Sequence, residues 1–166
     1  SITSGTSPSL TATTSGGNTD EGFANAIPIG FSFDYNGTSY TSLGVCTNGF
    51  LYLGSSGLNT NNVTYSNNLI SGFSSTQRPL IAPFWDDLDV QSATNIKYKT
   101  TGTAPNRVFT IEWANVLWDY SATSACISFQ TSLYEGTNVI EFIYKQETGT
   151  PSDADGNLGA SIGLTA

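Results

Sequence analysis

The chain has 166 residues, of which 13 are acidic and five are basic, so its formal charge is −8. That length fits one domain, and the scarcity of cations argues against nucleic acid or an acidic membrane surface as a partner. Histidine is absent, which excludes Ser/His/Asp and Cys/His catalytic systems and the usual histidine-bearing metal sites.

Charged residues make up only 11% of the chain, so Ser, Thr, Asn and Gly must form much of the surface, as in many extracellular β proteins. Methionine is also absent. We therefore expect that a segment ahead of Ser1 was removed, most simply a secretory signal peptide, although a cloning boundary or an incomplete sequence would look the same. No run approaches 18 apolar residues, so membrane insertion is not expected.

The first 22 residues contain few large apolar side chains and end in the Gly-rich stretch SGGNTDEG. We expect residues 1–22 to form an N-terminal arm and a flexible spacer ahead of a folded domain at residues 23–166. The last part of the arm is β-prone and weakly apolar, so it suits a sheet edge better than a core. This predicted assembly strand comprises Ser9, Leu10, Thr11, Ala12, Thr13 and Thr14.

Strand signals run through the remaining chain. Apolar residues alternate with small or polar ones from Ala26 to Phe33, which is the period of a half-buried strand. Asn36-Gly37 then gives the strongest short hairpin signal, and Asn48-Gly49 gives a second turn. Further strands are predicted at 40–46, 50–53, 95–99, 107–113, 126–134, 139–144 and 159–164, and residues 79–90 are predicted to form a buried strand that runs into an acidic turn.

Between these strands, residues 54–78 are rich in Gly, Ser and Asn. We expect a long loop there, with a short strand near Val63–Tyr65. Many short strands separated by turn signals at near-regular spacing are typical of all-β domains. The sequence therefore predicts a single antiparallel β-sandwich, jelly-roll or immunoglobulin-like, with an extended N-terminal arm.

The two cysteines, Cys46 and Cys126, both fall in predicted strands. In an extracellular domain we expect them to form one disulfide, with two buried free thiols as the alternative. The bond would close a loop of about 80 residues, for which the chain-entropy treatment gives at most about 4–5 kcal/mol.

Three carboxylates, Asp86, Asp87 and Asp89, follow a predicted buried strand. Such hard oxygen ligands are candidates for Ca²⁺, the one cofactor that the sequence suggests; a solvated acidic turn is the alternative. The stretch SDADGN at 152–157 begins like a calcium loop. It lacks the downstream Glu and the flanking helices, so a plain Asp-Gly turn is the simpler interpretation.

Aromatic residues suggest a sugar contact at one place. Trp118 and Tyr120 lie outside the clean strand alternation, which makes them candidates for stacking on a glycan. Trp85 and Trp113 lie on alternating strands and are expected in the core.

Glu112 and Glu141 are the closest approach to the carboxylate pair of a glycosidase. Each sits between apolar neighbours at a strand position expected to face solvent, so we expect no enzymatic activity. Asn36 and Asn62 each begin an N-glycosylation pattern. In a chain this rich in Asn and Thr, two chance matches are ordinary.

Several segments in this order resemble one family: AIPIGFSFDYNGTSYTSLGVCTNGFLYLG, RPLIAPFWDDLD, GTAPNRVFTIEW, ISFQTSLYEGTNVIEFIY and GASIGL. The family is an extracellular β-sandwich domain common in large secreted and cell-surface proteins of the Bacteroidota, and the likeness covers nearly all of residues 20–166. The segment LIAPFWDDLD is also similar to the core motif of nidogen-like domains, which are extracellular matrix and adhesion modules. Both resemblances imply an extracellular, non-catalytic domain.

We therefore expect a secreted structural subunit of an extracellular filament or adhesive surface layer. The arm of one subunit would add a β-strand to the next copy, and this contact, repeated head to tail, would form a homopolymer. Pairing of the arm with its own domain is the alternative. The second candidate function is a carbohydrate-binding or adhesion module, with surface glycans as the partner.

Overall fold

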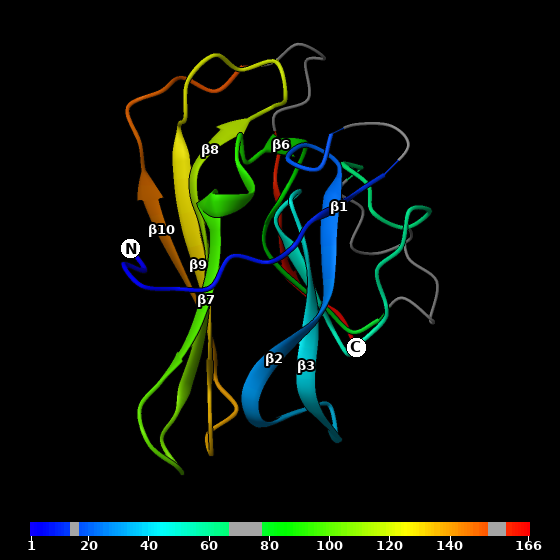
Figure 1. The fold of residues 1–166 in the computed structure, drawn as a ribbon, viewed down its shortest axis with the longest axis vertical. Coiled ribbons are helices and arrows are strands. Elements are labelled where there is room, and N and C mark those ends of the chain that lie inside the picture. The colour runs from blue at the N-terminus through cyan, green and yellow to red at the C-terminus, as the bar shows by residue number, and fades with distance from the viewer. Residues whose placement is uncertain (14–16, 67–77, 153–158) are drawn as a thin grey trace.

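The computed structural model describes residues 1–13, 17–66, 78–152 and 159–166. Two antiparallel sheets pack face to face as two layers (Figure 1), which confirms the predicted β-sandwich. No helix in this part of the chain is long and apolar enough to cross a bilayer.

Each sheet is a series of antiparallel hydrogen-bonded strands. The order in the first sheet is β1 (Thr11–Ala12), β2 (Gly22–Tyr35), β3 (Thr38–Cys46), β4 (Phe50–Leu53), β5 (Leu80–Trp85) and β11 (Ser161–Leu164). The order in the second sheet is β10 (Ile140–Gln146), β9 (Ile127–Tyr134) and β8 (Val108–Trp118), and both β7 (Ile96–Thr101) and the short β6 (Leu88–Asp89) pair with β8. A short 3-10 helix, η2 (Ala93–Asn95), leads into β7.

The main core lies between the two sheets and is filled by alternate strand positions. In β2 the buried side chains from Ile27 to Phe33 alternate with exposed ones, as the sequence pattern predicts. From the second sheet, the ring of Trp113 stacks on that of Phe129 with centroids 4.9 Å apart. Full burial of one such side chain contributes about 1.5–3 kcal/mol, so this layer of aromatic and aliphatic residues stabilises the sandwich.

A second apolar cluster covers the outer face of the first sheet. Leu58 and Val63, from the loop after β4, pack there with Trp85. The Trp85 indole N–H donates to the Thr64 carbonyl oxygen at 3.0 Å. The described part of the predicted long loop, residues 54–66, therefore packs on the outer face of the first sheet. It contains no strand at Val63–Tyr65, where a short one was predicted.

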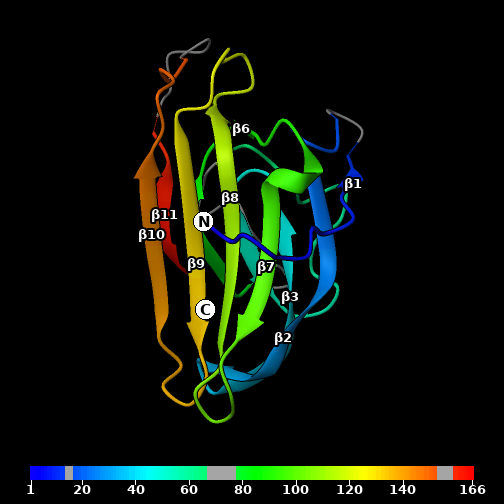
Figure 2. The ribbon, with the colours of Figure 1, turned by 60° about the vertical axis from the view of Figure 1, so that its left-hand side comes forward.

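The N-terminal arm crosses the outer face of the second sheet and then follows one lateral side of its own sandwich to β1 (Figure 2). Thr11 in β1 pairs with Phe23 in β2, and Thr6 exchanges two backbone hydrogen bonds of 2.9 Å with Tyr98 in β7. Pro8, between these contacts, is buried. The arm thus joins both sheets. The structure has the cis pairing that was the alternative expectation, and the arm does not extend away from its domain.

The predicted spacer is described from residue 17 onward, and residues 17–22 are tied to the domain. The Thr47 hydroxyl accepts a hydrogen bond from the Gly22 N–H at 2.9 Å and donates one to the Asp20 carbonyl oxygen. The expectation of a flexible spacer is wrong for these residues, because the β3–β4 turn holds their backbone. Thr14, the last residue of the predicted assembly strand, lies outside the described residues.

The opposite lateral side of the sandwich is open. Within the described ranges, neither β10 nor β11 has another strand on its outer side, and Figure 2 shows both strands at the same side of the molecule. The Tyr144 hydroxyl of β10 donates to the Pro83 carbonyl oxygen of β5 at 2.6 Å, which joins the two layers there. Of the seven large apolar side chains exposed in the described chain, five lie on or beside these strands: Val139, Ile143, Tyr144, Ile162 and Leu164. We call these five residues the open-side patch.

Candidate functional site

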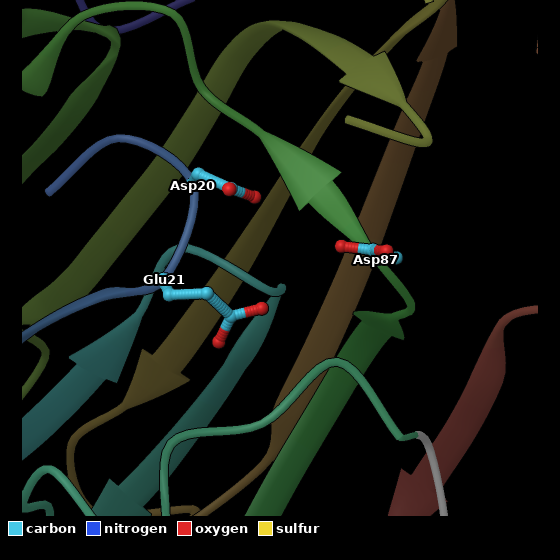
Figure 3. Close-up of side chains that lie close together, drawn as sticks. All are labelled: Asp20, Glu21 and Asp87. Carbon is cyan, nitrogen blue, oxygen red and sulfur yellow. The ribbon is translucent and has the colours of Figure 1, made fainter. Parts of the chain in front are cut away.

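Three carboxylates from two distant segments lie close together (Figure 3). Asp20 and Glu21 come from the turn before β2, and Asp87 comes from the connection between β5 and β6. One carboxylate oxygen of each residue lies within 4.8 Å of the others. We call these three residues the acidic cluster.

The turn between β3 and β4 holds both acidic segments in place. Asn48 is fully buried, and its side-chain oxygen accepts a hydrogen bond from the Leu88 N–H at 3.0 Å. The Asn48 carbonyl oxygen accepts a second one from the Asp86 N–H at 3.3 Å. Because Thr47 in the same turn binds the backbone of Asp20, one turn fixes the relative position of the carboxylates.

Burial and mutual repulsion make the cluster electrostatically unfavourable when it is empty of cations. Burial, followed by the negative charges of Asp20, Glu21, Asp119 and Asp86, raises the pKa of Asp87 to about 7. Burial is also the main cause that raises the pKa of Asp20 and of Glu21. Buried carboxylates that repel one another are stabilised by protons or by a bound cation.

The predicted triad of Asp86, Asp87 and Asp89 is not brought together as a ligand set. Asp86 Oδ2 accepts a hydrogen bond from the Trp118 indole N–H at 2.7 Å. Asp89 Oδ1 accepts one from the Gln91 N–H at 2.6 Å. Of the three, only Asp87 joins the acidic cluster, because successive residues of an extended segment point in different directions.

Glu112, near the middle of β8, anchors the beginning of the arm. Its side chain is on the outer face of the second sheet, yet Glu112 is only 4% exposed because Ser1 and Ile2 of the arm bind its carboxylate. Glu112 Oε2 accepts hydrogen bonds from the Ile2 N–H at 3.0 Å and the Ser1 hydroxyl at 3.1 Å. Gln130 Nε2 donates to Oε1 at 2.8 Å. The expectation of a solvent-facing Glu112 is wrong, although the outer face was correct.

Glu112 and Glu141 lie in different rows of that outer face. Glu112 is opposite Gln130, whereas Glu141 is opposite Ser132. The Tyr134 hydroxyl donates to Glu141 Oε2 at 2.6 Å. The arm occupies one carboxylate and Tyr134 binds the other, so the two do not face each other across a cleft.

Cys46 and Cys126 are both buried free thiols, so the predicted disulfide is not formed. Cys46 points away from the second sheet, into the outer cluster with Phe50 and Trp85. Cys126 lies just before β9 in the second sheet, with its Sγ 3.9 Å from the Val116 carbonyl oxygen. The main core separates the two thiols.

The aromatic candidates for a sugar contact have different environments. The indole N–H of Trp118 is already used in a hydrogen bond, and its ring packs edge-on against Phe84 with centroids 4.6 Å apart. Trp118 is therefore a packing residue. Tyr120 is 50% exposed and stays a prediction. Trp85 and Trp113 are fully buried, as expected.

The two glycosylation patterns also differ. Asn36 is exposed at the tip of the β2–β3 hairpin, so modification there stays a prediction. Asn62 is buried, its Nδ2 donates to the Gly57 carbonyl oxygen at 2.6 Å, and its Oδ1 accepts the Asn59 N–H at 2.8 Å. The prediction for Asn62 is wrong for the folded chain, because both amide atoms are in use. The Asp-Gly turn predicted for SDADGN lies, from residue 153 onward, outside the described residues.

Comparison with known proteins adds one finding to this geometry. A family model described as NIDO related matches residues 1–166. Comparison with curated proteins and with solved structures gave no match. The family match agrees with the likeness to nidogen-like domains at LIAPFWDDLD. It does not bear on the resemblance to the domain of the Bacteroidota.

Proposed function

We propose that this chain, which belongs to the NIDO-related family, is an extracellular structural domain and acts as a subunit of a filament or adhesive surface layer. Domains of this family are typically extracellular. The resemblance to the extracellular sandwich domain of the Bacteroidota supports the same location. A subunit of a filament or surface layer must bind other protein chains, so the exposed edges and apolar side chains of the domain are the features relevant to this proposal.

The observation that carries the proposal is the asymmetry between the two lateral sides of the sandwich. On one side the arm pairs with β2 and with β7. On the other side β10 and β11 are the outermost strands of their sheets within the described ranges, and the open-side patch is between 43% and 53% exposed. An unpaired strand edge flanked by apolar side chains is a template for pairing with another chain.

The proposed partner is a second copy of this chain. The strand that the sequence offers as a donor is the arm, with its β-prone segment from Ser9 onward. Donation requires the arm to leave Phe23 and Tyr98 of its own domain and to pair with the open side of the next copy. Because donor and acceptor surfaces differ, the contact does not close on itself, and its repetition produces a filament.

Lysine substitutions on the open side test this proposal. Ile143→Lys and Ile162→Lys each place a charge on an exposed apolar position of β10 or β11. Thr38→Lys adds the same charge at an exposed position at the start of β3 and serves as the matched control. Light scattering after size exclusion measures the mass of each protein as a function of concentration.

We expect the unmodified chain and Thr38→Lys to form larger species as concentration rises. The two open-side variants should weaken association by about tenfold or more, which corresponds to about 1.4 kcal/mol. Deletion of residues 1–13 should abolish association if the arm is the donor. A chain that stays monomeric at every concentration, or that associates equally well in all variants, would refute the proposal.

A further inference from the structure

We propose that Asp20, Glu21 and Asp87 form a binding site for Ca²⁺, which joins the base of the arm to the β5–β6 connection. This inference does not depend on the proposed function, because none of the three carboxylates belongs to the open-side patch. Three features carry it: the spacing of the carboxylates, a buried carboxylate oxygen of the cluster that lacks a partner, and the chemistry of the donors.

The spacing of the carboxylates fits one ion. Protein oxygens bind Ca²⁺ at about 2.3–2.6 Å, so two ligands of the same ion lie no more than about 5 Å apart. One oxygen from each of the three carboxylates lies within 4.8 Å of the others. Figure 3 shows Asp20 and Asp87 pointing toward each other from facing segments, with Glu21 beside them. An ion between them could contact all three without a change of backbone.

The second, independent observation is a carboxylate oxygen of the cluster that is buried without a hydrogen-bond partner. Asp20 Oδ1 is buried and accepts no hydrogen bond. Glu21 beside it is only 6% exposed. A buried polar atom without a partner costs about 1–3 kcal/mol, so Asp20 Oδ1 indicates a cation that completes the site.

The charges around the cluster have the sign that a cation requires. Asp86 and Asp119 add to the negative potential at Asp87. Two of the chain's five basic residues, Arg107 and Lys145, form ion pairs at other places, with Glu135 and Glu147. A divalent cation would offset the repulsion that the carboxylates exert on one another.

The donor set selects a hard ion. All three ligands are carboxylates, the chain has no histidine, and neither Cys46 nor Cys126 belongs to the cluster. Soft and borderline metals such as zinc prefer thiolate and imidazole ligands. Three carboxylates from two separate segments can satisfy the flexible coordination of Ca²⁺, whereas Mg²⁺ demands a near-ideal octahedron and releases its water reluctantly.

Calcium binding is measured directly on the whole chain after treatment with a chelator, by equilibrium dialysis with radioactive Ca²⁺ and by thermal unfolding. We expect one ion per chain. The unfolding midpoint should rise by roughly 5–10 °C at a Ca²⁺ concentration 100 times the dissociation constant. Mg²⁺ at the same concentration should give a smaller rise.

Two nearly isosteric variants locate the site, and two others serve as controls. Asp87→Asn and Glu21→Gln each remove one ligand charge and should weaken binding by roughly tenfold or more, since Ca²⁺ affinity follows ligand charge. Glu141→Gln removes a carboxylate far from the cluster and should bind like the parent chain. Asp89→Asn removes a negative charge that acts on Asp20 but is not a ligand, so it should weaken binding less than either ligand variant. Circular dichroism confirms that each variant is folded.

If the parent chain bound no Ca²⁺ even at millimolar concentration, the proposal would be overturned. Equal weakening in all four variants would do so as well, because it would show attraction by general negative charge and not a site. Loss of binding in Asp89→Asn alone would assign the ion to the segment after Asp87.

Discussion

Replacement of Glu112 by Ala should release the beginning of the arm and leave the rest of the sandwich folded. The carboxylate is buried beneath the arm and accepts hydrogen bonds from Ser1 and Ile2 on one side and from Gln130 on the other. Alanine removes every one of these acceptors. The neighbouring strands β7 and β9 keep their backbone pairing with β8, so the sheet itself stays intact.

The size of the effect follows from the two bonds to the arm. Hydrogen bonds to a charged group contribute about 1.5–3 kcal/mol each when buried, and less near solvent. For the exposed beginning of the arm we expect a total loss of about 2 kcal/mol, which is about a 30-fold increase in the open fraction. Glu112→Gln, which keeps one side-chain oxygen acceptor, should lose about half of this free energy.

Amide hydrogen exchange measures the opening residue by residue. The Thr6 N–H, bonded to Tyr98 at 2.9 Å, should exchange about 30-fold faster in Glu112→Ala. The Thr13 N–H, bonded to the Glu21 carbonyl oxygen at 2.9 Å, should change little, because β1 still pairs with β2. Gln130→Ala is the control that leaves the arm's two bonds to Glu112 in place. An unchanged Thr6 rate in Glu112→Ala would refute the anchoring role.

Other parts of the structure give further predictions. Phe129→Ala should lower the free energy of unfolding by about 3–5 kcal/mol in chemical denaturation, because the fully buried ring stacks on a tryptophan in the main core; a loss below about 1 kcal/mol would contradict the packing. Arg107 lowers the pKa of Glu135, so this pair stabilises the fold at pH values above the ordinary pKa of a carboxyl group. The contribution is lost as the pH falls through the lowered pKa of Glu135. In Glu135→Gln the thermal unfolding midpoint should therefore fall less steeply as the pH is lowered through the acidic range. An unchanged pH dependence of the midpoint would count against a contribution from this pair. Burial raises the pKa of both Cys46 and Cys126, so an alkylating reagent should label neither thiol in the native chain. Both thiols should be labelled after unfolding without reductant. If the unfolded chain were labelled only after addition of reductant, it would contain the disulfide.

The strands were predictable because burial leaves a periodic signal in the sequence. The alternation between Ala26 and Phe33 lies within β2, and Asn36 and Gly37 adopt positive φ values of 47° and 77° at the hairpin, as that dipeptide favours. Such signals are local, so they give the element and its buried face. They do not say which strands share a sheet.

The features that the sequence could not give depend on contacts between distant segments. Thr6 and Thr11 are exposed and hold the arm through backbone hydrogen bonds, which have no side-chain signature. Both cysteines were expected in strands: Cys46 lies in β3, whereas Cys126 lies one residue before β9. Strand assignment does not tell which sheet or face each thiol occupies. The disulfide prediction failed for that reason.

The acidic cluster shows the same limit. The run after Trp85 indicated a carboxylate-rich place, and Asp87 does belong to one. Its partners, Asp20 and Glu21, lay in a stretch that was expected to be a flexible spacer. Only the β3–β4 turn, which binds both segments, brings them together. The signal that could have found them is an acidic pair at the start of the first long strand.

The central claim, association through the open side, is tested most directly by a photoreactive benzoylphenylalanine in place of Ile162, with Thr38 replaced in a control. Light should join the residue at position 162 to a second copy of the chain, and mass spectrometry of the product should identify residues 1–13 of that copy as the attachment point. The control should give no such product. Illumination at a concentration at which light scattering reports association, with no cross-link from position 162, would contradict the account.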